Sequence, residues 1–252
     1  MIDVVIPVYN STKLVQQCVD AIYAQKRVNS IIIVNDASTD TNLLDYLDNV
    51  KATVLHNHRN LGFVYSVNRG MEMAQTEYAV IVNSDVVPLL NDALLKLVTT
   101  MDSVKAHVGG AKLLFMSGSK FGKPWTIQHA GVGFDPDGKP YHPFMHLHRD
   151  TKAANIPKLV HAVTGAVMGI RMSKWRELGG FDRRYAPGVF EDVDYCLRAK
   201  RVVYEPLSEW LHLMHGSQTE GVNLFDYHDE NLKLLLSRWQ MESDESLYYG
   251  GA

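Results

Sequence analysis

The sequence has little cysteine and no long apolar run, and each absence narrows the class of protein. Cys18 and Cys196 are the only cysteines among 252 residues, too few and too far apart for a disulfide framework or a zinc knuckle. This usage is typical of a reducing compartment. No apolar run approaches the roughly 20 residues that span a bilayer, and no basic-then-apolar leader precedes the first strand-like residues. We therefore expect a cytoplasmic protein without a transmembrane segment.

A charge excess of either sign is also missing. The 25 lysines and arginines nearly balance the 28 aspartates and glutamates, so the net charge is −3. This balance gives no electrostatic reason to expect nucleic acid as a partner. Hydrophobic residues make up 46% of the chain, which is enough for a globular core. We expect a single domain over residues 1–240 and a frayed tail at 241–252.

Strands and helices alternate through the first part of the chain. Apolar runs predict strands at residues 2–8, 31–34, 53–56, 79–82 and 107–114, with helices between them. Asn10 or Ser11 is expected to cap the first helix, and Thr39 or Asp40 the second. Such βαβ units predict an α/β fold with a mainly parallel central sheet flanked by helices.

The pattern loosens after residue 115. Residues 115–158 are rich in glycine, proline, histidine and aromatics, and residues 131–138 predict a hairpin with a tight turn. Further helices are expected at 172–178, 190–200 and 226–239. Two separate short strands are expected at 202–204 and 209–211. This half of the chain is expected to carry a small second sheet.

Polar residues end the buried strand at 79–82. Asn83-Ser84-Asp85 follows it directly, and Pro88 turns the chain. In an open α/β sheet, side chains at the carboxyl ends of strands face the ligand site. Asn83 and Asp85 are equally able to shape a turn and nothing more. The choice depends on the remaining motifs.

Several short motifs occur in one order along the chain. They are Ile6-Pro7-Val8-Tyr9-Asn10, Asn35-Asp36-Ala37-Ser38-Thr39-Asp40, Asn60-Leu61-Gly62-Phe63, Asn83-Ser84-Asp85, Gly179-Gly180-Phe181-Asp182 and Glu191-Asp192-Val193-Asp194. Together they resemble the family 2 inverting glycosyltransferases with the GT-A fold, over about residues 2–217. The resemblance implies a nucleotide-binding half at 1–101 and an acceptor and catalytic half at 102–240.

The resemblance places the nucleotide-sugar donor at the loops of the first half. Asp36 is an acceptor suited to the N3–H of uracil or thymine, and Tyr9 offers a face for stacking. Ala37 stands where the family usually has glycine. The residues expected to bind the donor are Pro7, Val8, Tyr9, Asp36, Ser38, Asn60, Gly62, Asn68, Asn83, Ser84, Asp85, Thr164 and Gly165.

A divalent cation is expected on the diphosphate, because the chain lacks the glycine-lysine phosphate loop of P-loop proteins. Mg²⁺ or Mn²⁺ takes oxygen ligands and nitrogen. The family usually has Asp-x-Asp at this strand end, and the single acid here resembles rhamnosyltransferase-like members. Asp85 is the expected ligand, completed by His212 or His215. The alternative cluster His142, His146 and His148 lacks a carboxylate pattern, so acceptor contact or a surface position is expected there.

The resemblance assigns the base to Asp192, which would take a proton from the acceptor hydroxyl. Glu191 would bond the acceptor, and the crowded acids are expected to raise a carboxyl pKa. Asp194 is expected only to favour the helix N-terminus. Thr164 and Gly165 would line the floor under the donor sugar, or merely pack a strand.

The sequence thus predicts a metal-dependent inverting glycosyltransferase that moves a sugar from a UDP- or dTDP-sugar to a hydroxyl of a glycan or other acceptor. Two alternatives remain open. One is a non-catalytic glycan- or nucleotide-sugar-binding module, suggested by the reduced Asn83-Ser84-Asp85 motif. The other is a sugar-nucleotide nucleotidylyltransferase, which would want a basic, glycine-rich loop after the first strand. The sugar, the acceptor and the oligomeric state are not indicated.

Overall fold

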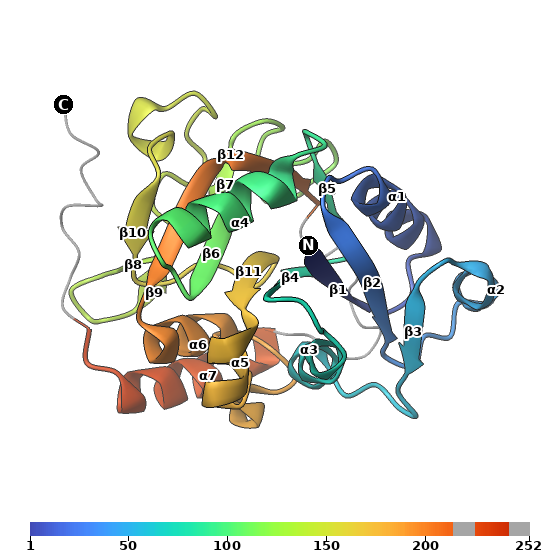
Figure 1. Ribbon diagram of the computed structural model, residues 1–252. Helices are drawn as coiled ribbons and strands as arrows, with labels where there is room; N and C mark the ends of the chain where they lie inside the picture. Colours follow the sequence, from blue (N-terminus) through green and yellow to red (C-terminus); the bar gives the residue numbers. More distant parts are fainter. Residues whose placement is uncertain (214–224, 242–252) are drawn as a thin grey trace.

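The computed structural model describes residues 1–213 and 225–241. Its first half alternates strands and helices, as the sequence predicts (Figure 1). The elements in order are β1 (Ile2–Val8), α1 (Thr12–Tyr23), β2 (Val28–Asn35), α2 (Thr41–Asn49), β3 (Thr53–His56), α3 (Phe63–Glu72), β4 (Tyr78–Val82), β5 (Val86–Pro88), α4 (Ala93–Ser103) and β6 (Val108–Phe115).

Within the described residues, the second half adds further strands, three α-helices and two 3₁₀ turns. The elements are β7 (Ile127–His129), β8 (Gly133–Phe134), β9 (Pro140–Tyr141), the 3₁₀ turn η1 (Lys152–Ala154), β10 (Lys158–Val160), β11 (Val167–Arg171), α5 (Met172–Leu178), the 3₁₀ turn η2 (Arg183–Tyr185), α6 (Glu191–Ala199), β12 (Val202–His212) and α7 (Phe225–Arg238). The predicted hairpin is confirmed, because β8 and β9 pair as a small antiparallel sheet.

One central sheet runs through both halves in the order β10-β12-β6-β11-β4-β1-β2-β3. Neighbours β4, β1, β2 and β3 are parallel, and so are β6 and β12. β11 lies between β4 and β6 and runs antiparallel to both. The sheet is therefore mixed and mainly parallel. Because β11 runs the other way, its first residue, Val167, lies opposite Val82, the last residue of β4.

Helices cover both faces of the sheet. α1, α2 and α4 bury their apolar residues on one face, and α3, α5, α6 and α7 on the other (Figure 1). Alternation along β1 divides its side chains between the two layers, with Val4 and Ile6 on the α1 side and Val5 on the α3 side. None of the helices within the described ranges is long and apolar enough to cross a membrane.

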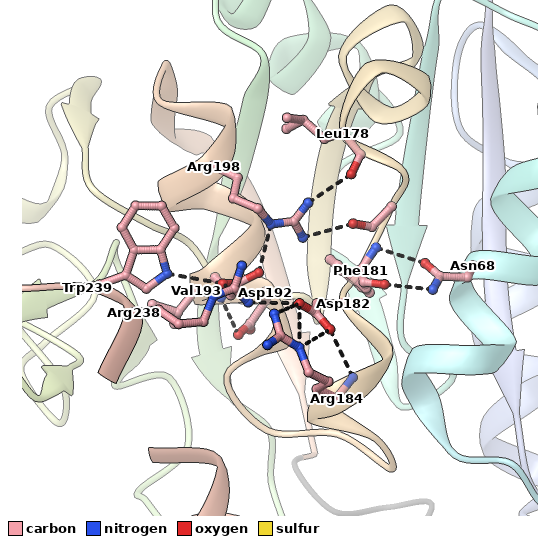
Figure 2. Close-up of polar contacts among 12 residues, drawn as sticks. Asn68, Leu178, Phe181, Asp182, Arg184, Asp192, Val193, Arg198, Arg238 and Trp239 are labelled. Atoms are coloured by element: carbon pink, nitrogen blue, oxygen red, sulfur yellow. Dashed lines mark hydrogen bonds and ion pairs between the residues drawn. The ribbon is translucent and has the colours of Figure 1, made fainter. Parts of the chain in front are cut away.

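α7 is tied to α6 by a buried ionic network (Figure 2). Asp194 of α6 is fully buried and lies 2.8 Å from Arg198 Nε and 2.9 Å from Arg238 Nη1. Trp239 Nε1 donates to the same carboxylate at 3.1 Å. Arg238 also pairs with Asp182, at 2.8 Å. The expectation that Asp194 serves only the helix N-terminus is therefore wrong, since it also anchors the helix that follows β12.

Two local predictions also need correction. Residues 202–204 and 209–211 belong to one strand, β12, whose pairing with β6 skips from Glu205 to Glu209. Pro206 cannot donate to the ladder, which accounts for a bulge at this position. Ser11 precedes α1 with φ 62° and forms no side-chain cap. The tail expected at residues 241–252 lies outside the described residues except for Met241.

Candidate active site

Parallel neighbours β4, β1 and β2 end at one edge of the sheet, and the polar residues that follow them meet there. Tyr9 follows β1, Asp36 follows β2 and Asn83 follows β4. The backbone joins these loops, since Asp36 N donates to Val8 O at 2.9 Å. The turn before β11 joins the same edge, because Asn83 N donates to Ala166 O at 2.8 Å.

Asp36 is the centre of a buried hydrogen-bond network. Its Oδ1 accepts from Asn57 Nδ2 at 2.6 Å and from Leu61 N at 2.9 Å, and its Oδ2 accepts from Gly62 N at 2.8 Å. Gly62 has φ +84°, and a Cβ there would lie 2.5 Å from Pro187 Cβ, so only glycine fits. Asp36 thus fixes the loop before α3 and still has acceptor capacity on Oδ2.

The side chains of Ser38 and Asn60 each accept a hydrogen bond from a backbone N–H of the loops. Ser38 Oγ accepts from Asn10 N at 2.8 Å, which links the loop after β2 to the loop after β1. That loop begins at Tyr9, and Pro7 and Val8 are the last two residues of β1. Asn60 Oδ1 accepts from Gly62 N at 3.1 Å. Tyr9 is half-buried.

Asn68 has a structural role that differs from its expected donor contact. Its Nδ2 donates to Phe181 O and its Oδ1 accepts from Phe181 N, each at 2.9 Å (Figure 2). Asn68 is buried within α3, so these bonds hold the Gly180-Phe181 turn against that helix. We therefore leave Asn68 out of the site.

Asp85 and His212 face each other at the end of β12. β5 pairs antiparallel with β12, which sets His212 opposite Val86 and beside Asp85. His212 Nε2 lies 3.2 Å from Asp85 Oδ1, and both residues are buried. Ser84, the residue between Asn83 and Asp85, is buried as well.

This pair fits a divalent cation. Neighbouring ligands of an octahedral Mg²⁺ at ~2.1 Å lie ~3.0 Å apart, close to the observed separation. His212 Nδ1 lies 2.7 Å from Gln128 Oε1, which leaves Nε2 as the ring nitrogen that faces Asp85. Within residues 1–213 and 225–241, no three His, Cys, Asp or Glu side chains form a metal cluster. His215 lies outside those ranges. A cation here needs ligands from phosphate oxygens or water in addition.

His142, His146 and His148 do not gather into a metal site. His142 Nδ1 lies 3.0 Å from His129 Nδ1. His146 stacks on Phe115 with ring centroids 5.3 Å apart, and exposed His148 lies 3.5 Å from Asp150. The expected surface position agrees with the exposure of His146 and His148, whereas His142 is half-buried. The alternative, acceptor contact, stays a prediction.

Glu191 and Asp192 open α6 beside the turn that precedes β11. Asp192 Oδ2 accepts from Gly165 N at 2.8 Å, and its Oδ1 accepts from Val193 N at 2.7 Å. Burial raises the pKa of Asp192, and these donors oppose the rise. Burial and the charge of Asp192 raise the pKa of Glu191 well above its usual range. Glu191 Oε2 is buried without a hydrogen-bond partner among the described residues. Glu191 therefore holds its proton at pH values where Asp192 is ionised.

The turn at Thr164 and Gly165 lies between the loop that carries Asp85 and the α6 N-terminus that carries Glu191 and Asp192. Asn83 bonds Ala166, and Gly165 bonds Asp192, so the Asp85 loop and the α6 N-terminus lie on either side of this turn. A Cβ on Gly165 would lie 3.5 Å from Asp192 Cβ and 3.4 Å from Phe63, which is ordinary contact. The structure thus brings together Asp36, Asn83, Asp85, His212, Thr164, Gly165 and both acids of α6 at one edge.

Some residues of this edge were missed from the sequence. Gln128 contacts His212, Asn57 contacts Asp36, and His129 Nε2 accepts from Thr164 N at 3.4 Å. Each contact joins segments far apart in the chain, and none of these residues belongs to the motifs above. No local signal in the sequence points to them.

Comparison with known proteins gives one family. Residues 3–179 match the family model described as glycosyl transferase family 2. Glycosyltransferase GlyG of Streptococcus pneumoniae is 37% identical over 90 residues, which cover 34% of this chain and 30% of that protein. The aligned part is thus less than a third of the relative.

Solved structures share the fold at low identity. GalNAc-T7, solved with UDP, GalNAc and Mn²⁺, superposes with a TM-score of 0.68 at 16% identity, over 84% of this chain and 43% of its own. TarS residues 1–349 of S. aureus, in complex with UDP-GlcNAc, give 0.60 at 16% identity, over 89% and 60%. The mannosyltransferase PcManGT of Pyrobaculum calidifontis, with GDP-Man and Mn²⁺, gives 0.63 at 14% identity, over 98% and 66%. This chain therefore spans less than two thirds of each of these proteins.

Proposed function

The chain belongs to glycosyl transferase family 2, and we propose that it is a metal-dependent inverting glycosyltransferase of the rhamnosyltransferase-like kind. The donor is a UDP- or dTDP-sugar, and the acceptor is a hydroxyl of a glycan or another molecule. One observation carries the proposal. A facing Asp85–His212 pair and the Asp192 carboxyl lie on either side of the Thr164–Gly165 turn, at the ligand edge of the sheet.

The nucleotide belongs at the loops after β1 and β2. The remaining acceptor capacity of Asp36 Oδ2 suits the N3–H of a pyrimidine base, and half-buried Tyr9 offers a stacking face. Pro7, Val8, Ser38, Asn60 and Gly62 lie in or beside these loops, so they belong to the proposed nucleotide site. Relatives of this fold have been solved with UDP and with GDP-Man, which fits a nucleotide-sugar donor.

The diphosphate belongs beside Asn83, Asp85 and His212. Asn83 Oδ1 is buried without a partner among the described residues, so it can accept from the ribose or from a metal-bound water. Asp85 and His212 would hold Mn²⁺ or Mg²⁺, which would supply positive charge against the negative charge of the leaving diphosphate. His215 remains a candidate ligand from the sequence alone.

The chemical step is a single displacement. The acceptor oxygen forms a bond to the anomeric carbon while the bond from that carbon to the phosphate oxygen breaks, which inverts the configuration. The hydroxyl proton passes to Asp192, whose two oxygens each keep acceptor capacity beyond their backbone bonds. Protonated Glu191 can donate to the acceptor. Thr164 and Gly165 form the floor under the sugar. The cytoplasmic location remains part of the proposal and rests on the sequence.

A donor screen that measures release of free nucleoside diphosphate, with and without Mn²⁺, tests the proposal. The wild type should release UDP or dTDP only with a divalent cation present, and EDTA should remove the activity. Binding of UDP with Mn²⁺ without turnover of any donor would favour the binding-module alternative. Activity unaffected by EDTA would contradict metal dependence.

Asp192→Asn tests the base. The amide keeps the shape but cannot take the proton, so turnover should fall by about 10²–10⁴-fold. The affinity for UDP with Mn²⁺, measured by calorimetry, should stay within about twofold, because Asp192 does not touch the nucleotide loops. Asp137→Asn makes the same chemical change at an exposed position and serves as the control. Normal turnover by Asp192→Asn would refute the assignment.

A further inference from the structure

The short strand β7 carries two adjacent polar side chains into the interior. Gln128 is 5% exposed and His129 is 1% exposed. Burying a polar side chain is unfavourable unless it is hydrogen-bonded. β7 pairs only with β6 among the described strands, and successive side chains of a strand point to opposite sides. Gln128 and His129 therefore reach two different parts of the molecule.

Gln128 reaches the pair at the end of β12. Its Oε1 lies 2.7 Å from His212 Nδ1, and a carbonyl oxygen only accepts. The ring proton is therefore on Nδ1, and Nε2 is left to face Asp85 Oδ1 at 3.2 Å. In the neutral ring Nε2 is an acceptor, and it can lie this close to a carboxylate oxygen only when a second proton or a metal cation lies between the two atoms. Gln128 thus presents the one ring nitrogen that can bind a cation beside Asp85.

His129 reaches the turn that holds Asp192. Its Nε2 accepts from Gly131 N at 3.3 Å and from Thr164 N at 3.4 Å. A backbone N–H only donates, so Nε2 has the lone pair and the proton is on Nδ1. That proton faces His142 Nδ1 at 3.0 Å. The residue after Thr164 is Gly165, whose N–H donates to Asp192 Oδ2.

We infer that Gln128 and His129 are positioning residues for the transfer reaction, one for each half of the site. Gln128 orients His212 toward the cation, and His129 orients the Thr164–Gly165 turn that holds Asp192. Neither touches the reacting atoms. The inference rests on the proposed function, because it assigns the cation to Asp85 and His212 and the base to Asp192.

Four variants separate the two roles. Gln128→Met keeps the length of the side chain and removes the acceptor, whereas Gln128→Glu keeps an acceptor oxygen. His129→Phe keeps the ring and removes the acceptor, whereas His129→Gln places an oxygen near the position of Nε2. Thermal unfolding of all four identifies any loss that comes from misfolding alone.

Calorimetry with Mn²⁺ in the presence of UDP gives the first readout. Gln128→Met should weaken Mn²⁺ binding by about 10–100-fold, as expected when the partner of a metal-ligating histidine is lost, and Gln128→Glu should restore it. His129→Phe should leave Mn²⁺ affinity within about twofold and lower the turnover rate at saturating donor, and His129→Gln should recover part of that rate. If Gln128→Met and His129→Phe each lowered both the Mn²⁺ affinity and the turnover rate to the same extent, the two residues would not have separate roles. A wild type that binds no Mn²⁺ would overturn the assignment of Gln128.

Nitrogen-15 NMR of the histidine rings gives a readout that needs no turnover. The wild type with Mg²⁺ and UDP should show His212 and His129 protonated on Nδ1 and His142 protonated on Nε2, with peaks assigned by their loss in single variants. Exchange of the Gly165 amide proton should be faster in His129→Phe and close to wild type in His129→Gln. A proton on Nε2 of His129 or His212 would refute the corresponding half. If the wild type turns over no donor, the proposed function fails, and with it the role of both residues in transfer. The binding and NMR results still decide separately whether Gln128 orients His212 and whether His129 orients the Thr164–Gly165 turn.

Discussion

Glu191 and Asp192 are adjacent carboxyl groups in different states. Glu191 has a buried oxygen without a described partner, whereas both oxygens of Asp192 accept backbone N–H groups. Hydrogen bonds to the charged form favour ionisation, and burial without them opposes it. The proton of the pair therefore belongs to Glu191, which leaves Asp192 free to act as a base.

Glu191→Gln tests this order of protonation through pH. Gln resembles the protonated acid, so the acid limb of the activity profile, set by Asp192, should stay where it is in the wild type. Because burial raises the pKa of Glu191 in the folded state above its unfolded value, the wild type loses stability as pH rises from the unfolded pKa. The melting temperatures of the two proteins should agree near pH 4, and the variant should be more stable at pH 8. A less stable variant at pH 8 would contradict the raised pKa.

Ala37 has a backbone conformation that favours glycine. Its φ is 60°, at the position where the resemblance expects glycine. A left-handed backbone costs a residue with a Cβ about 1–2 kcal/mol, and glycine avoids this cost. Glycine also raises the conformational entropy of the unfolded chain, which lowers the stability by about 0.4–1 kcal/mol. Ala37→Gly should therefore raise the free energy of unfolding by about 0.5–1 kcal/mol in urea titration. Ala24→Gly, at φ −77°, should lower it. A loss of stability in both variants would contradict the strain at Ala37.

At the scale of elements, Asp40 joins two helices that the sequence treats separately. Its Oδ1 accepts from Asn42 N and Leu43 N at the start of α2. Its Oδ2 accepts from Thr12 N and Thr12 Oγ1 at the start of α1. The cap of α2 follows from local spacing, which is why it could be predicted. The cap of α1 comes from a residue 28 positions away, so sequence spacing pointed to Asn10 or Ser11 instead.

The α6–α7 network predicts how strongly α7 is anchored. Asp194→Ala leaves the Arg198 and Arg238 guanidinium groups without their buried partner, which should cost about 3–5 kcal/mol of unfolding free energy. Asp92→Ala removes a half-buried i,i+4 pair with Lys96 at the surface of α4 and should cost no more than about 1 kcal/mol. Urea titration measures both. Equal losses would show that the network contributes no more than a surface pair.

At the scale of the molecule, the site joins residues from both halves of the chain. Asp36 and Asp85 come from the first half, and Asp192 and His212 from the second. UDP with Mn²⁺ should therefore stabilise the whole fold. At a concentration of 100 times the dissociation constant, a ligand adds about 2.7 kcal/mol, or roughly 5–10 °C in melting temperature for a chain of this size.

Asp85→Asn provides the control for that shift. The variant should keep the shift caused by UDP alone and lose the additional shift caused by Mn²⁺, since the amide is a weaker cation ligand than the carboxylate. Scanning calorimetry at fixed nucleotide concentration measures both. An unchanged Mn²⁺ effect in Asp85→Asn would place the cation elsewhere.

The sequence predicted those features that depend on short spacing. Asn83-Ser84-Asp85 at a strand end and Gly179-Gly180 after α5 are local signals. The strands predicted for the first half, β1, β2, β3, β4 and β6, lie close to their predicted ranges. Contacts between distant segments were not predictable. Asn68 is an example, since its amide bonds Phe181, 113 residues away. Gln128 is another, because its contact with His212 spans 84 residues. Pattern and propensity carry no signal for such pairs.

Residues 116–157 connect β6 to β10 and join the central sheet through β7. Insertions or deletions in this connection can change the acceptor that the enzyme uses, because neither β6 nor β10 has to move. β7 limits that freedom, since it lies inside the connection while its side chains contact His212 and Thr164. Chimaeras that exchange segments on either side of β7 should retain function more often than chimaeras that replace β7 itself.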